Sequence, residues 1–181
     1  GSGCSSPPRW APRSRRQGVA VTESVPYPFA RRLLAWFERH GRHDLPWQRE
    51  RTPYRVWVAE VMLQQTQVAT VIPYYERFMS RFATLRALAE APLDDVLHHW
   101  SGLGYYARAR NLQAAAIEVL RDHGGELPDH HETLCRLPGI GPSTGAAILA
   151  QAHNRRHPIL DGNVKRVLCR WLAIEGAPQD S

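Results

Sequence analysis

Residues 137–145 read LPGIGPSTG, and this stretch decides the fold prediction. Gly139 and Gly141 are separated by one residue, which lets the backbone turn sharply between two helices. The segments on either side, about 130–137 and 142–153, carry apolar residues at helical spacing. The start of the second helix would direct unpaired backbone N–H groups outward, where they can bind a phosphate. We therefore predict two helices joined by a tight, phosphate-binding turn.

The same glycines also approximate the fingerprint of a dinucleotide-binding fold, because Asp161 follows Gly141 by twenty residues. The spacing here is G-x-G-x-x-x-G instead of G-x-G-x-x-G, and the segment before it has a helical rather than a strand pattern. A dinucleotide-binding fold also needs several parallel strands. No convincing strand pattern occurs in the sequence, so we reject this interpretation.

Helical spacing of apolar residues continues along most of the chain, which predicts an all-α fold with many short helices. Thr52 followed by Pro53 is typical of a helix start, and we expect this helix to run to about residue 70. Pro73 is expected to begin or kink the next helix. Residues 1–26 are rich in Ser, Pro, Gly and Arg and are predicted to form a disordered arm. Further helices are expected near 29–40, 84–90, 92–100, 106–123 and 162–174, and a loop at 44–47.

The composition narrows the possible functions. Of the 181 residues, 43% are hydrophobic, and no apolar run approaches the roughly 20 residues that a membrane-spanning helix needs. Three cysteines that are distant in sequence exclude a disulfide-stapled scaffold and a local zinc knuckle. The net charge is +6, and Lys165 is the only lysine beside 22 arginines. Arginine suits phosphate contacts and base stacking, so nucleic acid is a candidate partner, with a codon bias toward arginine as the equal alternative.

Glu60 is the first candidate for chemistry, because it lies in a helical segment, 56–63, that is apolar on nearly every side. A helix that is hydrophobic all round is buried, and burial raises the pKa of a carboxyl group. A carboxyl group with a raised pKa is suited to act as a general acid near neutral pH. The alternative is a glutamate on a narrow solvent-facing strip, or one paired with an arginine.

Asp161 precedes an apolar stripe at helical spacing and is predicted to be the N-cap of the last helix. The capping N–H groups and the helix dipole favour its ionised form. A structural cap needs no further role. Beside Glu60, however, Asp161 completes a pair of carboxyl groups whose surroundings push their pKa values apart. Such a contrast often separates an acid from a charge-stabilising group at one site.

The segment 103–111 combines aromatic and basic side chains at a glycine turn. Tyr105 and Arg108 lie on the same face of a helix at i, i+3. There an aromatic ring can wedge into a base stack, and an arginine can grip the DNA backbone. A tyrosine packed under a loop is the alternative.

Several stretches together resemble the helix-hairpin-helix superfamily of DNA glycosylases and, within it, the bacterial adenine DNA glycosylases of the MutY type. The resemblance extends from about residue 29 to 177. Its strings are long, which makes them far more specific than a single G-x-G. They are WVAEVMLQQTQVAT at 57–70, GLGYYARARNL at 102–112, LPGIG at 137–141 with Thr144, and PILDGNVKRV at 158–167.

The resemblance implies a two-domain helical architecture. Residues 51–156 would form a six-helix barrel that contains the hairpin at about 130–153. Residues 27–50, a helix and a loop, would belong to a second helical domain together with residues 157–181, the first helix of its C-terminal half. That second domain would be incomplete, and the active site would lie in the groove between the two.

The resemblance also implies roles for the candidate residues. Glu60 would protonate an adenine and later help to activate water, Asp161 would stabilise the oxocarbenium-like transition state, and Asn163 would orient the groups around Asp161. The substrate would be adenine opposite 8-oxoguanine or guanine in double-stranded DNA, flipped out of the stack before cleavage. We expect a monomeric, cytoplasmic bacterial enzyme. The predicted DNA-binding residues are Trp47 beside the base pocket, Gln65, Leu103 and Tyr105 in the vacated stack, Arg108, Ser143 and Thr144, and Gly139 and Gly141 at a phosphate that a bound monovalent cation can bridge.

Ser143 bears on the type of reaction. The related endonuclease III enzymes carry a lysine at this position, two residues beyond the second hairpin glycine, which forms a Schiff base with the sugar. A serine there implies a monofunctional glycosylase without strong strand-cleaving activity. Two alternatives are a bifunctional glycosylase/lyase and a hairpin module that binds DNA without chemistry.

The family normally continues into a four-cysteine run, C-x6-C-x2-C-x5-C, that binds a 4Fe–4S cluster, and into a domain that recognises 8-oxoguanine. Cys135 and Cys169 do not match this run, and the run occurs nowhere in the 181 residues. We therefore expect a fragment whose parent protein binds the cluster, with the cluster cysteines beyond Ser181. We also expect the fragment to lack part of the support that its activity and stability need.

Overall fold

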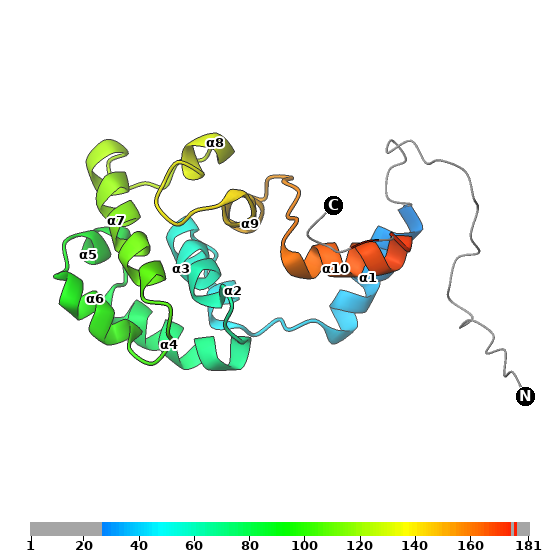
Figure 1. Cartoon of the computed structure of the whole chain (residues 1–181), viewed down its shortest axis with the longest axis horizontal. Helices are drawn as coiled ribbons and strands as arrows, with labels where there is room; N and C mark the ends of the chain where they lie inside the picture. The colour runs from blue at the N-terminus through cyan, green and yellow to red at the C-terminus, as the bar shows by residue number, and fades with distance from the viewer. Residues whose placement is uncertain (1–26, 175, 177–181) are drawn as a thin grey trace, which may run out of the picture. The chain divides into compact units, whose positions relative to one another are not determined.

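The computed structural model describes residues 27–174 and 176. Internal contacts divide the chain into two units, residues 1–42 and 43–181. The described residues form ten helices and no strand (Figure 1), which confirms the all-α prediction. The predicted disordered arm, residues 1–26, lies outside the described residues. The helices are α1 (Tyr27–His40), α2 (Pro46–Arg49), α3 (Pro53–Leu63), α4 (Val68–Arg81), α5 (Leu85–Ala89), α6 (Leu93–Trp100), α7 (Ala107–Asp122), α8 (His131–Leu134), α9 (Pro142–His153) and α10 (Gly162–Leu172).

The described part of the first unit consists of α1 and the two residues after it. The helix ends at Gly41, whose N–H donates to the carbonyl of Phe37 at 2.7 Å, as the predicted helix end requires. Its apolar residues Leu33, Leu34 and Trp36 are exposed. The amphipathic spacing that predicts this helix is therefore present, and its large apolar side chains face outward.

The core of the second unit is built around α3. Trp57, Val58 and Met62 are fully buried, and α3 packs against α2, α4, α7 and α9. Thr52 caps its start by accepting a hydrogen bond from the N–H of Arg55, and Pro53 is the first helical residue. A helix that packs on so many neighbours cannot keep a polar face. This burial is why its sequence is apolar on nearly every side.

The end of α3 differs from the prediction. The sequence predicts a helix to about residue 70, but α3 ends at Leu63 and α4 begins at Val68. Gln65 adopts a left-handed conformation with φ of 57°, which a continuous helix does not allow. Pro73 lies inside α4 rather than at its start. The break between the helices is formed by a turn that presents Gln65 to solvent.

The stretch 137–145 forms the predicted turn between two helices, α8 and α9. Gly139 has φ of 76°, and a Cβ atom there would lie 2.9 Å from Cβ of Asn111, so only glycine fits. Leu137 and Ile140 are buried beneath the turn and anchor it to the core. The prediction of a hairpin is confirmed, although α8 is a single turn, shorter than the expected 130–137.

A second short helix, α2, occupies a stretch that the sequence predicts to be a loop. Pro46 stands at its first helical position, and the N–H of Gln48 donates to the carbonyl of Leu45 at 2.8 Å. Trp47 is buried, and its ring lies edge-on against Tyr75 at 5.4 Å between centroids. This contact places α2 in the core of the second unit. The predicted division at residues 51–156 and 157–181 stays a prediction.

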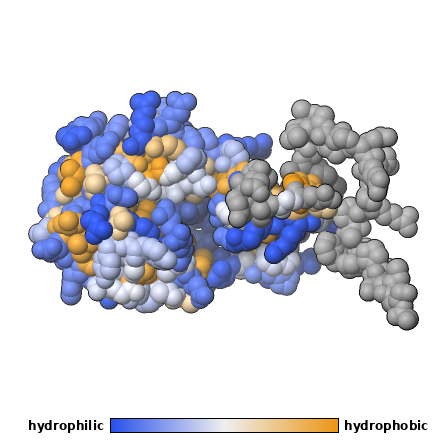
Figure 2. Space-filling model, in the orientation of Figure 1, coloured by the Kyte–Doolittle hydropathy of each residue, from blue (hydrophilic) through white to orange (hydrophobic). Residues whose placement is uncertain are grey.

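The surface carries both hydrophilic and hydrophobic residues. Figure 2 shows hydrophilic residues over much of the visible face of the second unit, with smaller hydrophobic patches between them. None of the described helices is long and apolar enough to cross a membrane.

Candidate active site

Glu60 lies in the interior of α3, where the flanking residues Ala59 and Val61 are buried. Its carboxyl oxygen Oε1 accepts a hydrogen bond from Nε2 of Gln151 in α9, at 2.8 Å. Burial raises the pKa of Glu60, and the charge of Asp161 raises it further, whereas the hydrogen bond from Gln151 lowers it. The predicted direction of the pKa shift and its main cause, desolvation, are confirmed.

Asp161 stands at the start of α10, as its sequence position predicts. Its Oδ1 accepts a hydrogen bond from the N–H of Val164 at 2.7 Å, which makes it the N-cap of the helix. Its other oxygen, Oδ2, accepts a hydrogen bond from Nδ2 of Asn163 at 3.3 Å. The Oδ1 of Asn163 in turn accepts from Arg166. Asn163 therefore contacts Asp161 directly, in keeping with the orienting role that the resemblance implies.

The fold brings the two carboxyl groups together although 101 positions separate them in the sequence. Asp161 is close enough for its charge to act on the pKa of Glu60. Glu60 is half-buried beside apolar residues of α3, and its burial raises the pKa of its carboxyl group. Asp161 accepts two hydrogen bonds at the start of α10. Such a pair can supply a proton and a negative charge to the same substrate.

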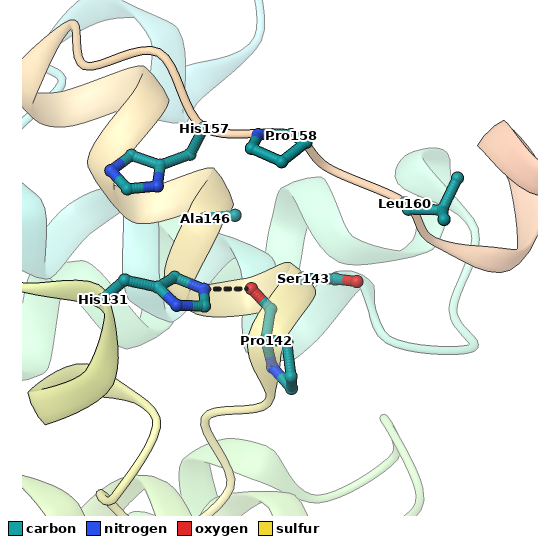
Figure 3. Close-up of a pocket in the computed structure, with 7 residues that line it drawn as sticks. All are labelled: His131, Pro142, Ser143, Ala146, His157, Pro158 and Leu160. Carbon is teal, nitrogen blue, oxygen red and sulfur yellow. Dashed lines mark hydrogen bonds between the residues drawn. The ribbon is translucent and has the colours of Figure 1, made fainter. Parts of the chain in front are cut away.

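A pocket of about 420 Å³ lies beside the start of α9 (Figure 3). It is bordered by Pro142, Ser143 and Ala146 of α9, and by the segment that leads to Asp161. On its other side Nε2–H of His131 donates a hydrogen bond to the carbonyl of Pro142, at 2.9 Å. Ser143, the position where the resemblance implies a lysine in Schiff-base-forming relatives, therefore borders this pocket. The remaining lining residues are His157, Pro158 and Leu160.

Two turns expose the side chains predicted to enter the base stack. Gln65 follows α3 and Tyr105 precedes α7, and both residues have a left-handed conformation, with φ of 57° and 49°. Both are exposed, and the exposed fraction of Tyr105 is 63%. Left-handed non-glycine residues cost free energy and persist where the surrounding structure holds them. The two turns are therefore features that the fold maintains.

Arg108 holds the two turns together. Its Nη1 donates to the carbonyls of Val61, Met62 and Gln64 at 3.0, 2.8 and 2.6 Å. Its Nη2 lies within hydrogen-bond distance of Oγ1 of Thr66 and of the carbonyls that precede Tyr105. Both terminal nitrogens of its guanidinium thus bind acceptors of its own chain, and the contact of Arg108 with the DNA backbone stays a prediction. These hydrogen bonds also explain why α3 ends where it does.

Three further residues predicted to contact DNA are buried. Trp47 and Leu103 belong to the hydrophobic core, with exposed fractions of 5% and 6%. Thr144 is also buried, and its Oγ1 accepts a hydrogen bond from Nε2 of Gln64 at 3.4 Å. In the structure these three side chains pack within the chain, and their predicted roles at DNA stay predictions.

Sequence reasoning missed Gln151, which is the side chain that contacts Glu60. A glutamine in a helix between alanines carries no signal of its own, since it fits a solvent-facing position equally well. Only the packing of α9 on α3 brings it to the carboxyl group. No pattern in the sequence could have found it.

The described residues do not fit an iron–sulfur cluster. They contain no group of three or more His, Cys, Asp or Glu side chains that could hold a metal ion. Cys135 contacts the ring of His131 at 3.7 Å from Sγ to Nε2 and is not part of a four-cysteine set. Ser181 lies outside the described residues, so the expectation of cluster cysteines beyond Ser181 stays a prediction.

The fold and the site define a class: an all-helical protein with a helix-hairpin-helix element and an acid–carboxylate pair beside the second hairpin helix. The sequence profile of the HhH-GPD superfamily of base excision DNA repair proteins matches residues 58–181. The chain therefore belongs to the HhH-GPD superfamily, which confirms the resemblance given by its motifs.

Relatives and solved structures agree with this membership. The adenine DNA glycosylase of Buchnera aphidicola subsp. Acyrthosiphon pisum (strain APS) is 47% identical over 154 residues, which are 85% of this chain and 44% of that relative. A thermostable thymine-DNA glycosylase has the same fold, with a TM-score of 0.77 and 26% identity over 85% of this chain and 70% of its own. A non-covalent endonuclease III–DNA complex has a TM-score of 0.70 and 23% identity, over 84% and 72%. The chain spans less than half the length of the curated relatives it matches.

Proposed function

We propose that the chain carries the catalytic centre of an adenine DNA glycosylase, which hydrolyses the N-glycosidic bond between adenine and deoxyribose. The observation that carries this proposal is the pair formed by Glu60 and Asp161. A carboxyl group whose pKa is raised by burial lies within electrostatic reach of the carboxyl group that caps α10. The family membership and the name of the relative with 47% identity point to the same reaction.

In this proposal Glu60 acts as the acid. Adenine is a poor leaving group as an anion, and protonation of a ring nitrogen lets it depart as a neutral base. The electron pair of the glycosidic bond moves to adenine and leaves a positively charged sugar. Burial raises the pKa of Glu60, which favours its protonated form over that of an exposed glutamate.

Asp161 and the ionised Glu60 complete the reaction. The carboxylate of Asp161 stabilises the positive charge that develops on the sugar, because a negative charge near the reacting centre is worth most where water is excluded. Water then adds to C1′ and gives up a proton to the Glu60 carboxylate. Glu60 is thereby restored to its acid form, and the products are free adenine and an abasic site.

DNA is the partner in this proposal, with adenine opposite 8-oxoguanine or guanine as the target. Gln65 and Tyr105 stand on exposed turns, where they could enter the stack that a flipped base vacates. The hairpin glycines Gly139 and Gly141 precede the start of α9, where backbone N–H groups can bind a phosphate. We place the enzyme on cytoplasmic DNA of a bacterium, as its motifs suggest.

Ser143 argues for hydrolysis without strand cleavage. A lyase needs an amine at the sugar, and Ser143 supplies only a hydroxyl group at this position. The only lysine of the chain, Lys165, is in α10. A bifunctional enzyme is therefore the weaker interpretation of this site.

A substrate panel tests the proposal. The purified chain is incubated with duplexes that carry adenine opposite 8-oxoguanine, guanine or thymine, and with a thymine–guanine mispair, and abasic sites are revealed by alkali. We expect product from the first two duplexes, no strand cleavage before alkali, and no efficient crosslink on borohydride reduction. Release of thymine or an efficient crosslink would contradict the proposal. Duplex binding without any excision would favour the binding-module alternative.

A further inference from the structure

The contact between Gln151 and Glu60 joins two distant parts of the chain at the proposed acid. Nε2 of Gln151, in the second hairpin helix α9, lies 2.8 Å from Oε1 of Glu60 in α3. The other carboxyl oxygen of Glu60, Oε2, has no hydrogen-bond partner in the part of the chain that the structure describes. The two oxygens of the carboxyl group are therefore not equivalent.

We propose that Gln151 is a positioning residue that fixes the carboxyl group of Glu60 and leaves Oε2 as the oxygen that carries the proton to the base. This inference rests on the proposed function of Glu60 and adds to it. It assigns a role to a residue outside the sequence strings that carry the family resemblance, and it assigns the proton to one named atom.

The chemistry of an amide gives the assignment its direction. An amide N–H is a donor only, so an oxygen 2.8 Å from it must accept. In a protonated carboxyl group the carbonyl oxygen is the better acceptor and the hydroxyl oxygen carries the proton. The hydrogen bond to Oε1 therefore favours the form in which Oε1 is the carbonyl oxygen and Oε2–H is the donor.

The neutral charge of Gln151 matters as much as its position. A lysine or arginine in the same place would hold Glu60 ionised, and an apolar residue would leave the buried carboxylate without any donor. The amide does neither, because it stabilises the carboxylate by a hydrogen bond and adds no net charge. Glu60 can then give up its proton and take one back in the same site.

The surroundings of Glu60 contain one opposing charge. Asp161, from the segment before α10, acts on Glu60 and opposes its ionisation. The helices α2, α4 and α7 also pack on α3 and contribute no charged group to this pKa among the described residues. Gln151 is thus the group that favours the ionised form against both burial and Asp161.

Nuclear magnetic resonance of the 181-residue chain tests this inference without DNA. The ¹³C signal of the Glu60 carboxyl group and the ¹⁵N–¹H signals of the Gln151 side-chain amide are followed as the pH is varied. We expect both groups to titrate with one midpoint. One amide proton of Gln151 should keep the downfield shift of a hydrogen-bonded proton at the lowest and the highest pH. The reason is that Oε1 accepts its hydrogen bond in both the protonated and the ionised form of Glu60.

A substitution supplies the second readout. Gln151→Leu removes the donor and keeps a side chain of similar size, so the Glu60 midpoint should rise by about 1 pH unit, the size expected of a hydrogen bond to a charged group. Gln64→Leu is the matched control, because Gln64 also reaches α9, at Thr144, and does not contact Glu60. It should leave the midpoint unchanged.

Two results would overturn the inference. An amide of Gln151 that does not follow the Glu60 titration would show that the contact is absent in solution. Loss of the downfield proton on acidification would show that Oε1, not Oε2, takes the proton. The wild-type titration gives these answers even where Gln151→Leu does not fold. Both are independent of excision, so a failure here is distinguishable from a failure of the proposed function.

Discussion

The two helices that carry the carboxyl pair are built in opposite ways. In α3, seven side chains are buried, among them Trp57 and Val58. In α10 no residue is buried, and the exposed fractions of Val167 and Leu172 are 55% and 53%. Glu60 stands in the interior of the first helix, and Asp161 caps the start of the second.

The difference shows what each carboxyl group depends on. The raised pKa of Glu60 comes from burial, so it requires the packing of α3 against its neighbours. The position of the Asp161 side chain comes from the hydrogen bonds that it accepts from Asn163 and from the N–H of Val164, residues two and three positions away in sequence. The acid is thus a product of tertiary structure, whereas the charge-stabilising group is a product of local structure.

The largest expected effect is on the stability of α3. Trp57→Ala should lower the free energy of unfolding by about 3–5 kcal/mol, because the indole ring is fully buried and its removal leaves a cavity. Val167→Ala in α10 should change it by less than about 0.5 kcal/mol, since that side chain is more than half exposed. Urea denaturation followed by circular dichroism measures both. Equal losses would mean that the contrast between the two helices is wrong.

A smaller effect is expected where α3 ends. Arg108→Ala should cost about 2–3 kcal/mol, because it leaves the carbonyls of Val61, Met62 and Gln64 without their donor. Limited proteolysis should then cut in the turn around Gln65. Arg110→Ala is the matched control, two residues further along α7 and exposed. If the two variants were equally resistant to protease, Arg108 would not be holding the turns.

The features of this site that depend on neighbouring residues follow from the sequence. Some of those that depend on contacts between distant residues do not. The hairpin, the cap at Asp161 and the burial of Glu60 follow from glycine spacing, from an aspartate before an apolar stripe, and from a helix without a polar face. The break after Leu63 does not follow, because the helix signal continues through Gln65. It arises from Arg108, which reaches back over more than forty residues to the carbonyls of α3. Long-range hydrogen bonds leave no periodic signal.

The exposure of the side chains predicted to contact DNA is the least predictable part. Tyr105 and Leu103 stand two positions apart in one motif, yet the first is exposed and the second lies in the core. The left-handed conformations of Gly104 and Tyr105 decide which side chain points outward. Turn geometry of this kind depends on the packing beneath it, which a motif does not encode.

The smallest expected effect is a pH dependence of stability that comes from Glu60. Its pKa is raised in the folded state from the ordinary value of 4.5, so the folded chain binds more protons than the unfolded chain between these two values. The stabilisation is complete below about pH 4.5 and is lost as the pH rises through the folded pKa. Glu60→Gln stays neutral, so its Tm should exceed that of the wild type at pH 8 and match it near pH 4. Glu90→Gln, at an exposed position, should show no such gain.

The central claim is that Glu60 supplies the proton on which base release depends. Single-turnover excision of adenine opposite 8-oxoguanine, compared between the wild type and Glu60→Gln with duplex binding measured in parallel, tests it most directly. A glutamine keeps the shape of the side chain and has no acidic proton, so excision should fall by about 10²–10⁴-fold while binding is retained. Adenine release at the wild-type rate by Glu60→Gln would contradict the account.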